Sequence, residues 1–322
     1  MPAPCLHAVT GAFGYSGRHI AQRLLDAGHQ VITLTNSAPT TDPFGGRVRV
    51  FPLDFADGGA LTASLRGVSV LHNTYWVRYA AAGVSFVEAV ANSKRLLAAA
   101  MGAGVRRVVH VSITNPAPDS PLPYFRGKAE VEQALVASGL SHAILRPAVL
   151  FGGESSILIN NICWALRRFP VFGVFGAGQY RLQPIHVDDL AALAVEQSAR
   201  PENAVVQAIG PETFTYRELA RTLGRLIGWR RPVIGVPPRL GFALAWLTGH
   251  LLGDVMLTWD EVRGLMQDRL CVDGAAPAGT TRLTDWVAGH ADELGRHYAS
   301  ELARRRRHAR LPDPARPASP QP

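Results

Sequence analysis

Three residues near the middle of the chain have the types and the spacing that acid–base chemistry at a substrate oxygen requires. Tyr124 and Lys128 stand four positions apart, a spacing that puts both side chains on one face of a helix. Ser112 ends a mostly apolar run that begins at Val108, which predicts a hydroxyl at the end of a strand. A Tyr-x-x-x-Lys pair also arises by chance on helix surfaces, but its place after this strand favours a catalytic site.

The chemistry that these residues could perform is proton transfer coupled to hydride transfer. A tyrosine with its usual pKa of about 10 is a weak base at neutral pH. A lysine ammonium and the positive charge of a nicotinamide would favour the phenolate and lower the pKa of Tyr124. The tyrosine would then exchange a proton with a substrate oxygen while hydride moves. In this scheme Lys128 also holds the nicotinamide ribose, and Ser112 hydrogen-bonds the carbonyl.

The beginning of the chain contains the pattern of a dinucleotide site. A short, mostly apolar run enters a Thr-Gly-x-x-Gly-x-x-Gly motif at residues 10–17, and an amphipathic segment follows. Strand, glycine loop and helix in this order are typical of a dinucleotide-binding fold. Gly11 permits the tight turn, Gly14 lets a pyrophosphate approach the backbone, and Gly17 lets the helix pack closely on the strand. The alternative is a glycine-rich turn without a ligand.

Strand and helix patterns alternate through the first half of the chain. Strands are predicted at 30–34, 47–53, 68–73, 107–112 and 142–145, and helices at 57–67, 85–103 and 124–138. This alternation predicts βαβ units and an α/β fold with a Rossmann-type, doubly wound parallel sheet.

The alternation breaks down after residue 147. Helices are predicted at 155–168, 188–199, 215–227 and 284–308, and a strand at 205–209; Asp188 and Asp189 are expected to cap the second of these helices, and Thr258 to Glu261 to form a capping box. We expect an NAD(P)-binding Rossmann domain over 1–150, to which segments around 180–210 return. A smaller α/β substrate lobe over 151–308 and a disordered, proline-rich tail over 309–322 follow.

Composition excludes several classes of protein. Much of the net charge of +8 comes from the arginines of 304–310. The sequence shows no basic surface with aromatic residues or elements that contact nucleic-acid grooves, so we expect no nucleic-acid partner. Three distant cysteines match neither a disulfide framework nor a metal-ligand spacing, so we expect no metal and a reducing, cytoplasmic location. Segment 240–257 is apolar but interrupted by glycines and short for a span of ~20 residues. It favours a core helix or a helix in peripheral contact with a membrane, without a transmembrane span.

Together these motifs resemble the extended or atypical short-chain dehydrogenase/reductase superfamily. The resemblance rests on the glycine loop of 10–17, on Asp54, on Ser112 with Tyr124 and Lys128, and on the runs 146–152 and 175–191. Within this superfamily, the sequence is similar to the epimerase/dehydratase-like branch that includes the nucleotide-binding accessory subunit of mitochondrial complex I. The resemblance implies an NAD(P)-dependent oxidoreductase or epimerase. The same branch contains proteins that bind dinucleotide without known turnover.

The resemblance and the loop pattern together give a set of expected cofactor-binding residues: Thr10, Gly11, Phe13, Gly14, Tyr15, Gly17, Arg18, Asn36, Ser37, Asp54, Phe55, Asn73 and Pro147. The resemblance implies that Asp54 and Phe55 lie at the adenine. NAD enzymes place an acid after the second strand for the ribose hydroxyls, and this chain has Asn36 and Ser37 there. An acid at this position would repel the 2′-phosphate of NADP(H), and this chain has none there. Arg18 could also add positive charge. NADP(H) is therefore favoured over NAD(H).

Two functions from different classes stay open. The first is an enzyme that acts on a carbonyl or hydroxyl of a small molecule. The Phe, Leu and Val of the second lobe suggest an apolar substrate, and core packing explains these residues equally well. The second is a non-catalytic NADP(H)-binding structural or sensor protein, associated with a membrane complex. The loop of 113–123 is shorter than in active extended members of the superfamily, which favours the second function. The complete Ser, Tyr and Lys set favours the first.

Overall fold

The centre of the molecule is a sheet of seven parallel strands. The computed structural model describes residues 5–39, 42–79, 84–153, 156–300, 302 and 308–310. In their spatial order the strands are β12 (Ala204–Ala208), β7 (Ser141–Pro147), β6 (Arg107–Val111), β5 (Val70–Asn73), β1 (Leu6–Thr10), β2 (Gln30–Thr35) and β4 (Val48–Pro52). The chain starts in the middle, runs to one edge and then to the other, which is the doubly wound order. The predicted fold class is confirmed.

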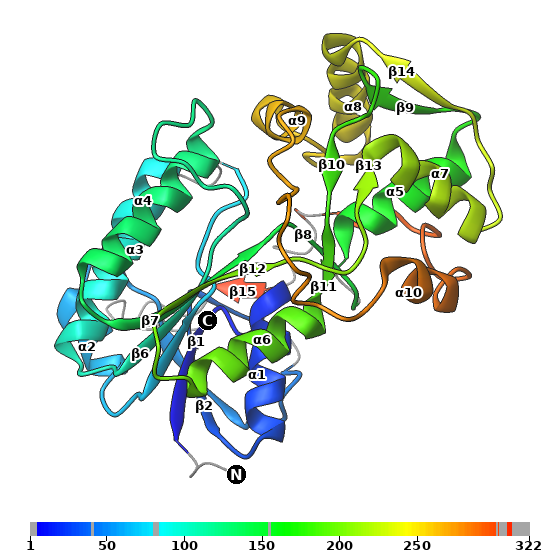
Figure 1. Ribbon diagram of the computed structural model, residues 1–322. Coiled ribbons are helices and arrows are strands. Elements are labelled where there is room, and N and C mark those ends of the chain that lie inside the picture. The colour runs from blue at the N-terminus through cyan, green and yellow to red at the C-terminus, as the bar shows by residue number, and fades with distance from the viewer. Residues whose placement is uncertain are drawn as a thin grey trace, which may run out of the picture.

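Helices cover both faces of this sheet. On one face α1 (Tyr15–Asp26) contacts α6 (Val187–Ala199), and on the other lie α2 (Gly58–Ser64), α3 (Phe86–Gly102) and α4 (Pro123–Ala137) (Figure 1). Because both faces are covered, the central strands are buried, as in β6, where all five residues are buried, the polar Arg107 and His110 included. The sheet thus separates two hydrophobic cores, one around Leu24 and Leu190 and the other around Leu96 and Leu135.

The second half of the chain builds short two-stranded sheets and further helices around a core of its own (Figure 1). The strand pairs are β8 (Val149–Phe151) with β11 (Pro184–His186), β9 (Phe172–Phe175) with β14 (Val233–Val236), and β10 (Arg181–Leu182) with β13 (Phe214–Thr215). The helices are α5 (Ile157–Arg168), α7 (Tyr216–Leu226), α8 (Pro238–Leu252), α9 (Trp259–Met266) and α10 (Leu283–Gly289). A last pair joins β3 (Ser37–Pro39) to β15 (His308–Arg310). The domain boundaries proposed from the sequence stay a prediction.

Among the residues that the structure describes, no helix combines the length and the hydropathy needed to cross a membrane. The apolar segment predicted at 240–257 forms α8, which ends at Gly253 with a left-handed φ of 63°.

The predicted final helix over 284–308 is wrong. Helix α10 ends at Gly289, and Gly295 takes a φ of +75°, where a Cβ would lie 2.4 Å from the carbonyl carbon of Cys163. Arg167 of α5 donates hydrogen bonds to the carbonyls of Ala291 at 2.6 Å and Leu294 at 2.9 Å. These carbonyls therefore bind a side chain instead of continuing a helix. The predicted tail after Arg310 lies outside the described residues.

Of the N-terminal caps predicted from the sequence, one is confirmed and one is wrong. The capping box predicted at Thr258 with Glu261 is confirmed, and the structure shows a second one at Thr215 with Glu218. The prediction that Asp188 and Asp189 cap α6 is wrong, because the helix begins at Val187 and the ring of His186 accepts the capping hydrogen bond. The two carboxylates bind elsewhere. Asp188 contacts His19 of α1 at 2.6 Å, and Asp189 accepts hydrogen bonds from the backbone N–H groups of Thr280 and Thr281.

Candidate functional site

The glycine loop connects β1 to α1 by a close contact between backbone atoms. Gly11 has a φ of +66°, and its carbonyl accepts a 2.8 Å hydrogen bond from the N–H of Gly14. A Cβ on Gly17 would lie 2.2 Å from that carbonyl oxygen. Gly14 is exposed and is the N-cap of α1, without a side-chain cap or an acidic residue in the first turn. The first N–H groups of α1 can therefore receive an anion, which is what a pyrophosphate site requires.

Aromatic neighbours hold this loop in place. The Tyr15 hydroxyl donates a 2.7 Å hydrogen bond to the carbonyl of Gly152, which follows β8. The ring of Phe13 lies 5.8 Å from that of Phe44. Both residues were expected to bind the cofactor, and the structure places them around the loop as its supports. Arg18 is exposed in the first turns of α1.

A buried polar chain crosses the carboxyl edge of the sheet from β1 to β6. The Thr10 hydroxyl lies 3.3 Å from the Asn73 carboxamide oxygen, and it accepts the N–H of Thr74 at 2.8 Å. The Asn73 amide nitrogen lies 3.2 Å from Nδ1 of His110. Thr10, Asn73 and His110 are each almost completely buried. Their mutual hydrogen bonds fix the ends of three neighbouring strands, at the edge where ligands of such sheets bind.

The residues expected at the adenosine end lie after β2 and β4. Asn36 is exposed, and its side-chain oxygen accepts the N–H of Leu53 at 3.0 Å, which leaves the amide N–H groups as donors. Asp54 is exposed and accepts the N–H of Ala56. The ring of Phe55 lies 4.8 Å from that of Tyr75. The Ser37 side chain lies outside the described residues, and Pro147 ends β7 in a buried position.

Lys128 is the most unusual member of the candidate catalytic set, because a charged residue type is 2% exposed there. Its Nζ donates a 2.8 Å hydrogen bond to the carbonyl of Val111 and lies 4.6 Å from the ring centre of Trp76. Val111 immediately precedes Ser112, so this bond brings the ammonium group of α4 to the end of β6. Tyr124 lies one helix turn away, and its ring meets Trp76 edge-on at 5.9 Å.

Ser112 directly follows β6, and its side chain has no hydrogen-bond partner among the described residues. Its backbone N–H donates to the carbonyl of Leu145 at 2.7 Å. Its Oγ is buried, and within the described ranges nothing forms a hydrogen bond with it. A buried hydroxyl without a partner loses about 1–3 kcal/mol. A ligand group or a water molecule beside this hydroxyl would satisfy it.

Burial shifts the pKa values of the tyrosine and the lysine in opposite directions. Desolvation raises the pKa of Tyr124 well above its usual value, Glu261 raises it further, and Arg78 opposes the shift. Desolvation lowers the pKa of Lys128 to about 7, against the opposing charge of Glu132. The pKa of Tyr124 is thus raised in the structure, whereas the sequence predicts that it is lowered. Without added positive charge, the tyrosine is held in its protonated form.

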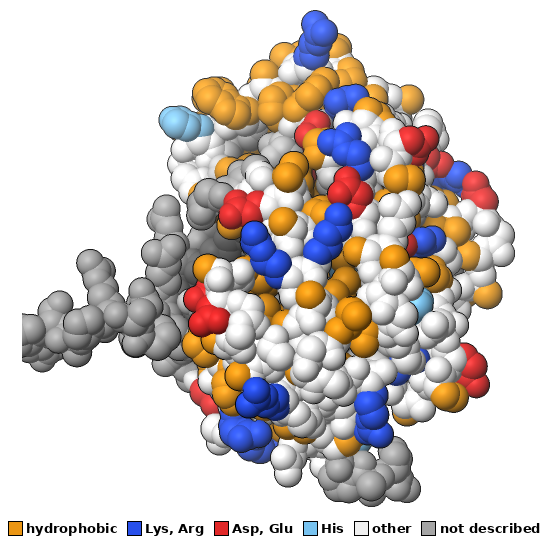
Figure 2. Space-filling model, turned by 90° about the vertical axis from the view of Figure 1, so that its left-hand side faces the viewer, with side chains coloured by type: hydrophobic (Ala, Val, Ile, Leu, Met, Phe, Trp, Pro, Cys, Tyr) orange, Lys and Arg blue, Asp and Glu red, His pale blue; other side chains and the backbone are white. Residues whose placement is uncertain are grey.

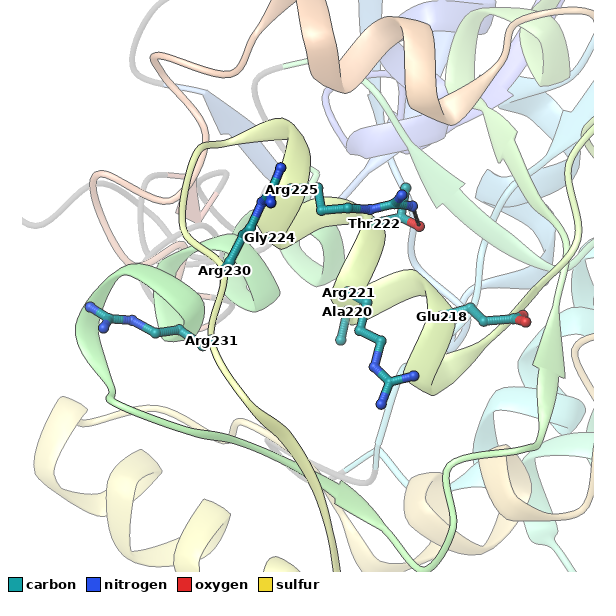
Figure 3. Close-up of a pocket in the computed structure, with 8 residues that line it drawn as sticks. All are labelled: Glu218, Ala220, Arg221, Thr222, Gly224, Arg225, Arg230 and Arg231. Atoms are coloured by element: carbon teal, nitrogen blue, oxygen red, sulfur yellow. Dashed lines mark hydrogen bonds between the residues drawn. The ribbon is translucent and has the colours of Figure 1, made fainter.

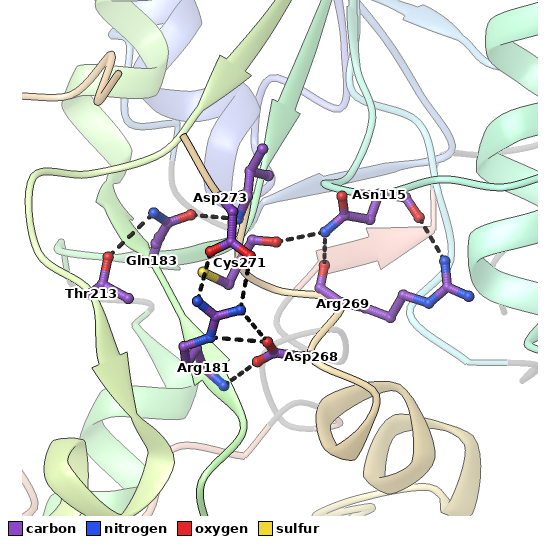
Figure 4. A network of polar contacts seen from close by, with 9 residues as sticks. Asn115, Arg181, Gln183, Thr213, Asp268, Arg269, Cys271 and Asp273 are labelled. Atoms are coloured by element: carbon purple, nitrogen blue, oxygen red, sulfur yellow. Dashed lines mark hydrogen bonds and ion pairs between the residues drawn. The ribbon is translucent and has the colours of Figure 1, made fainter. Parts of the chain in front are cut away.

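The second half of the chain covers this site with α9 and the segment that follows it. Arg78, after β5, forms a 2.6 Å ion pair with Glu261 of α9. The Asn115 side chain, in the loop after β6, donates to the carbonyls of Arg269 and Cys271 (Figure 4). A Cβ on Gly264 would lie 3.1 Å from the ring of Phe125, so α9 lies directly on the start of α4.

Ion pairs and hydrogen bonds hold the segment that follows α9 in place. Arg181 forms 2.6 Å contacts with both Asp268 and Asp273, and the side-chain oxygen of Gln183 accepts the N–H of Val272 (Figure 4). Neither this network nor the ion pair of Arg78 with Glu261 is predicted from the sequence. Their contacts join segments that are about 90 to 180 residues apart, so no local pattern indicates them.

Comparison with known proteins agrees with this architecture. The sheet order and the glycine loop define a dinucleotide-binding protein, and the NAD(P)H-binding family matches residues 11–159. A phosphate ester reductase from Streptomyces griseus, (4-alkanoyl-5-oxo-2,5-dihydrofuran-3-yl)methyl phosphate reductase, is 30% identical over 68% of this chain and 73% of its own length. The chain belongs to the extended or atypical short-chain dehydrogenase/reductase superfamily, whose members include oxidoreductases and epimerases.

Two further proteins show the breadth of the likeness. The mitochondrial NADH dehydrogenase [ubiquinone] 1 alpha subcomplex subunit 9 of Arabidopsis thaliana is 26% identical over 83% of this chain and 71% of its own length. The structure of an NADPH-dependent quinone oxidoreductase from Escherichia coli, solved with NADPH, is similar with a TM-score of 0.70. It is 22% identical, and the match covers 89% of this chain and all of that one.

Replacement of Lys128 tests the effect of its burial. Its folded-state pKa of about 7 lies below the usual lysine value of about 10.4, so the unfolded chain binds more protons between these two pH values. This lysine therefore makes the free energy of unfolding rise with pH from about 7 to 10, by up to ~1.4 kcal/mol per pH unit. We expect Lys128→Met to lose that rise in urea unfolding measured from pH 6 to 10. Lys94→Met, at an exposed position, is the matched control, and parallel profiles for the two variants would contradict the burial effect.

Proposed function

We propose that the protein is an NAD(P)-dependent oxidoreductase or epimerase that acts on a carbonyl or hydroxyl group at Ser112, Tyr124 and Lys128. The observation that carries the proposal is the unpartnered, buried Ser112 hydroxyl next to the carbonyl that binds Lys128. A hydroxyl at this edge of a parallel sheet faces the region where ligands bind. A bound nicotinamide would supply or accept the hydride.

Each residue has a distinct task in this proposal. The Ser112 hydroxyl donates a hydrogen bond to the substrate oxygen and so satisfies its own hydrogen-bonding capacity. Tyr124 holds the proton that is exchanged with the same oxygen. Lys128 acts through its charge, which favours the phenolate form of Tyr124, and its bond to Val111 holds it close to Ser112.

An apolar substrate is supported by the aromatic surroundings of Tyr124. Its ring contacts Trp76, Phe86 and Phe125 edge-on, with centroid distances of 5.7 to 5.9 Å. Phe86 and Trp76 are partly exposed. Aromatic side chains beside the hydroxyls of Ser112 and Tyr124 suit a ketone or aldehyde whose remaining atoms are hydrophobic.

Replacement of the proton donor tests catalysis. We expect Tyr124→Phe to slow NADPH oxidation with hydrophobic aldehydes and ketones at least ~100-fold, because general acid catalysis contributes about that factor or more. NADPH affinity, measured by cofactor fluorescence, should change less than twofold. Tyr216→Phe, in the second core, controls for loss of a buried hydroxyl. NADPH binding by the wild type without turnover of any such compound would favour the non-catalytic function instead.

The preference for NADP(H) is supported by the amide donors of Asn36 and by the absence of an acid at the end of β2. Asn36→Asp keeps the acceptor for the N–H of Leu53 but adds a negative charge beside a 2′-phosphate. We expect it to weaken NADPH binding at least ~10-fold in fluorescence titration and to leave NADH binding nearly unchanged. Asn203→Asp is the matched control, since Asn203 also accepts a backbone N–H, that of His142. Equal losses for both cofactors would contradict the proposed preference.

Peripheral contact with an anionic membrane surface is supported by α8. Leu244, Trp246, Leu247 and Leu251 are between 50% and 79% exposed, and the helix carries no acidic residue. Hydrophobic side chains gather at the top of the molecule in Figure 2, where Figure 1 shows α8 and β14. An apolar helix face of this kind favours insertion at the boundary of headgroups and acyl chains.

Arginines near this face favour anionic lipid over a neutral partner. A hollow of about 370 Å³ beside α7 is lined by Arg221, Arg225, Arg230 and Arg231 with a single acid, Glu218 (Figure 3). Residues 230 and 231 lie three and two positions before the start of β14, and Arg239 lies in the first turn of α8. This charge would attract the headgroups while the leucines enter the acyl region.

Vesicle binding tests this surface. We expect the protein to sediment with vesicles of phosphatidylcholine and phosphatidylglycerol, and less with phosphatidylcholine alone. Burial of a leucine stabilises by roughly 1.5–3 kcal/mol, so the double variant Leu244→Glu/Leu247→Glu should bind at least ~10-fold more weakly. Val136→Glu, at an exposed position of α4, is the control. Sedimentation equal to that of the control variant would show that α8 is not the contact.

The three cysteines support the predicted reducing, cytoplasmic environment, because Cys5, Cys163 and Cys271 are all free thiols.

A further inference from the structure

A cluster of metal-ligand side chains lies at the end of the sheet opposite to the glycine loop. Cys5 precedes β1, His7 lies within β1, and His29 directly precedes β2. Because β1 and β2 are parallel neighbours, their N-terminal ends meet at one edge. At ~3.3 Å per residue this edge is about 20 Å from Gly11. The cluster is therefore separate from the candidate catalytic site.

The three potential ligand atoms converge. The Cys5 sulfur lies 3.0 Å from Nε2 of His7 and 3.6 Å from Nδ1 of His29. All three atoms lie within 4.8 Å of one another. His7 is buried, whereas Cys5 and His29 are partly exposed. An ion could thus enter from solvent and be held against the sheet.

A third histidine supports the ring of His7 from behind. Nε2 of His72 lies 3.1 Å from Nδ1 of His7, on the side away from Cys5, and the two rings are stacked with centroids 5.3 Å apart. His72 is completely buried, and its other nitrogen has no partner among the described residues. Metal-ligating histidines usually donate their second N–H to such an outer partner, which fixes the ring and its tautomer.

We propose that Cys5, His7 and His29 bind a divalent transition-metal ion of the zinc type, with His72 as the residue that positions His7. One thiolate and two imidazoles are ligands that Zn²⁺ prefers, with water in the fourth position. The sequence predicts no metal, because the three cysteines match no metal-ligand spacing along the chain. The parallel pairing of β1 with β2 and β5 brings Cys5, His7, His29 and His72 together.

The distances require a small adjustment on binding. Bond lengths of about 2.3 Å to sulfur and about 2.1 Å to nitrogen place the two atoms ~3.6 Å apart in a tetrahedral site. Cys5 and His29 already have this separation, whereas Cys5 and His7 are closer, at 3.0 Å. Rotation of the partly exposed Cys5 side chain can open the second distance. The bound ion would then join the starts of β1 and β2.

Cobalt is the probe that reports the ligands directly. We expect the full chain, without an affinity tag and after treatment with a chelator, to bind one Co²⁺. Tetrahedral cobalt gives strong visible bands, and a thiolate ligand adds a charge-transfer band in the near ultraviolet. Zn²⁺ should displace the cobalt and raise the Tm, because a ligand that binds only the folded state stabilises it.

Variants distinguish this site from surface binding. Cys5→Ser should abolish the charge-transfer band, and His29→Asn, at a partly exposed position, should weaken binding at least ~10-fold. His72→Gln should weaken binding ~10–100-fold and retain the charge-transfer band. His250→Asn, at an exposed histidine of α8, should behave as wild type. A wild type that binds no more cobalt than Cys5→Ser, or binds it without the charge-transfer band, would overturn the proposal.

Discussion

The structure depends on a contact that tolerates no side chain. The start of α1 passes so close to the end of β1 that a Cβ on Gly17 would lie 2.2 Å from the Gly11 carbonyl oxygen. This closeness aims the N-terminus of α1 across the end of β1, and it sets where α1 meets α6 on the face of the sheet. The same closeness leaves Gly14 exposed at the N-terminus of α1, which has no side-chain cap, so that packing and anion recognition have one steric cause.

The carboxyl edge of the sheet shows how buried polar groups are arranged around this contact. Thr10, Asn73 and Nδ1 of His110 are joined by hydrogen bonds across three strands, and Lys128 donates to the carbonyl of Val111. Among the described residues, the Ser112 hydroxyl and Nε2 of His110 have no partner at this edge. Since a buried polar group without a partner costs free energy, the two atoms are places where a ligand or a water molecule would add a hydrogen bond. The edge thus combines paired polar groups with two that a ligand would satisfy.

The parts of the fold that could be predicted from the sequence are those set by local patterns. The strand and helix alternation, the glycine loop and the capping boxes at Thr215 and Thr258 depend on residues close together in the chain. The end of α10 could not be predicted, because Arg167 takes the carbonyls of Ala291 and Leu294 from a distance of more than 120 residues. The cover formed by Glu261 over Arg78, and the cluster of Cys5 with His29, likewise arise only when distant segments meet.

The opposite pKa shifts bear on the direction of the proposed reaction. Burial favours a protonated phenol at Tyr124, and it leaves Lys128 only about half charged near pH 7. A weakly charged lysine stabilises a phenolate poorly, so the site holds a proton donor more readily than a base. Donation of that proton to a substrate oxygen accompanies reduction of a carbonyl, whereas oxidation of an alcohol needs the phenolate. Under the proposed function, a protonated Tyr124 suits reduction of a carbonyl, and the reverse direction requires positive charge that arrives with a ligand.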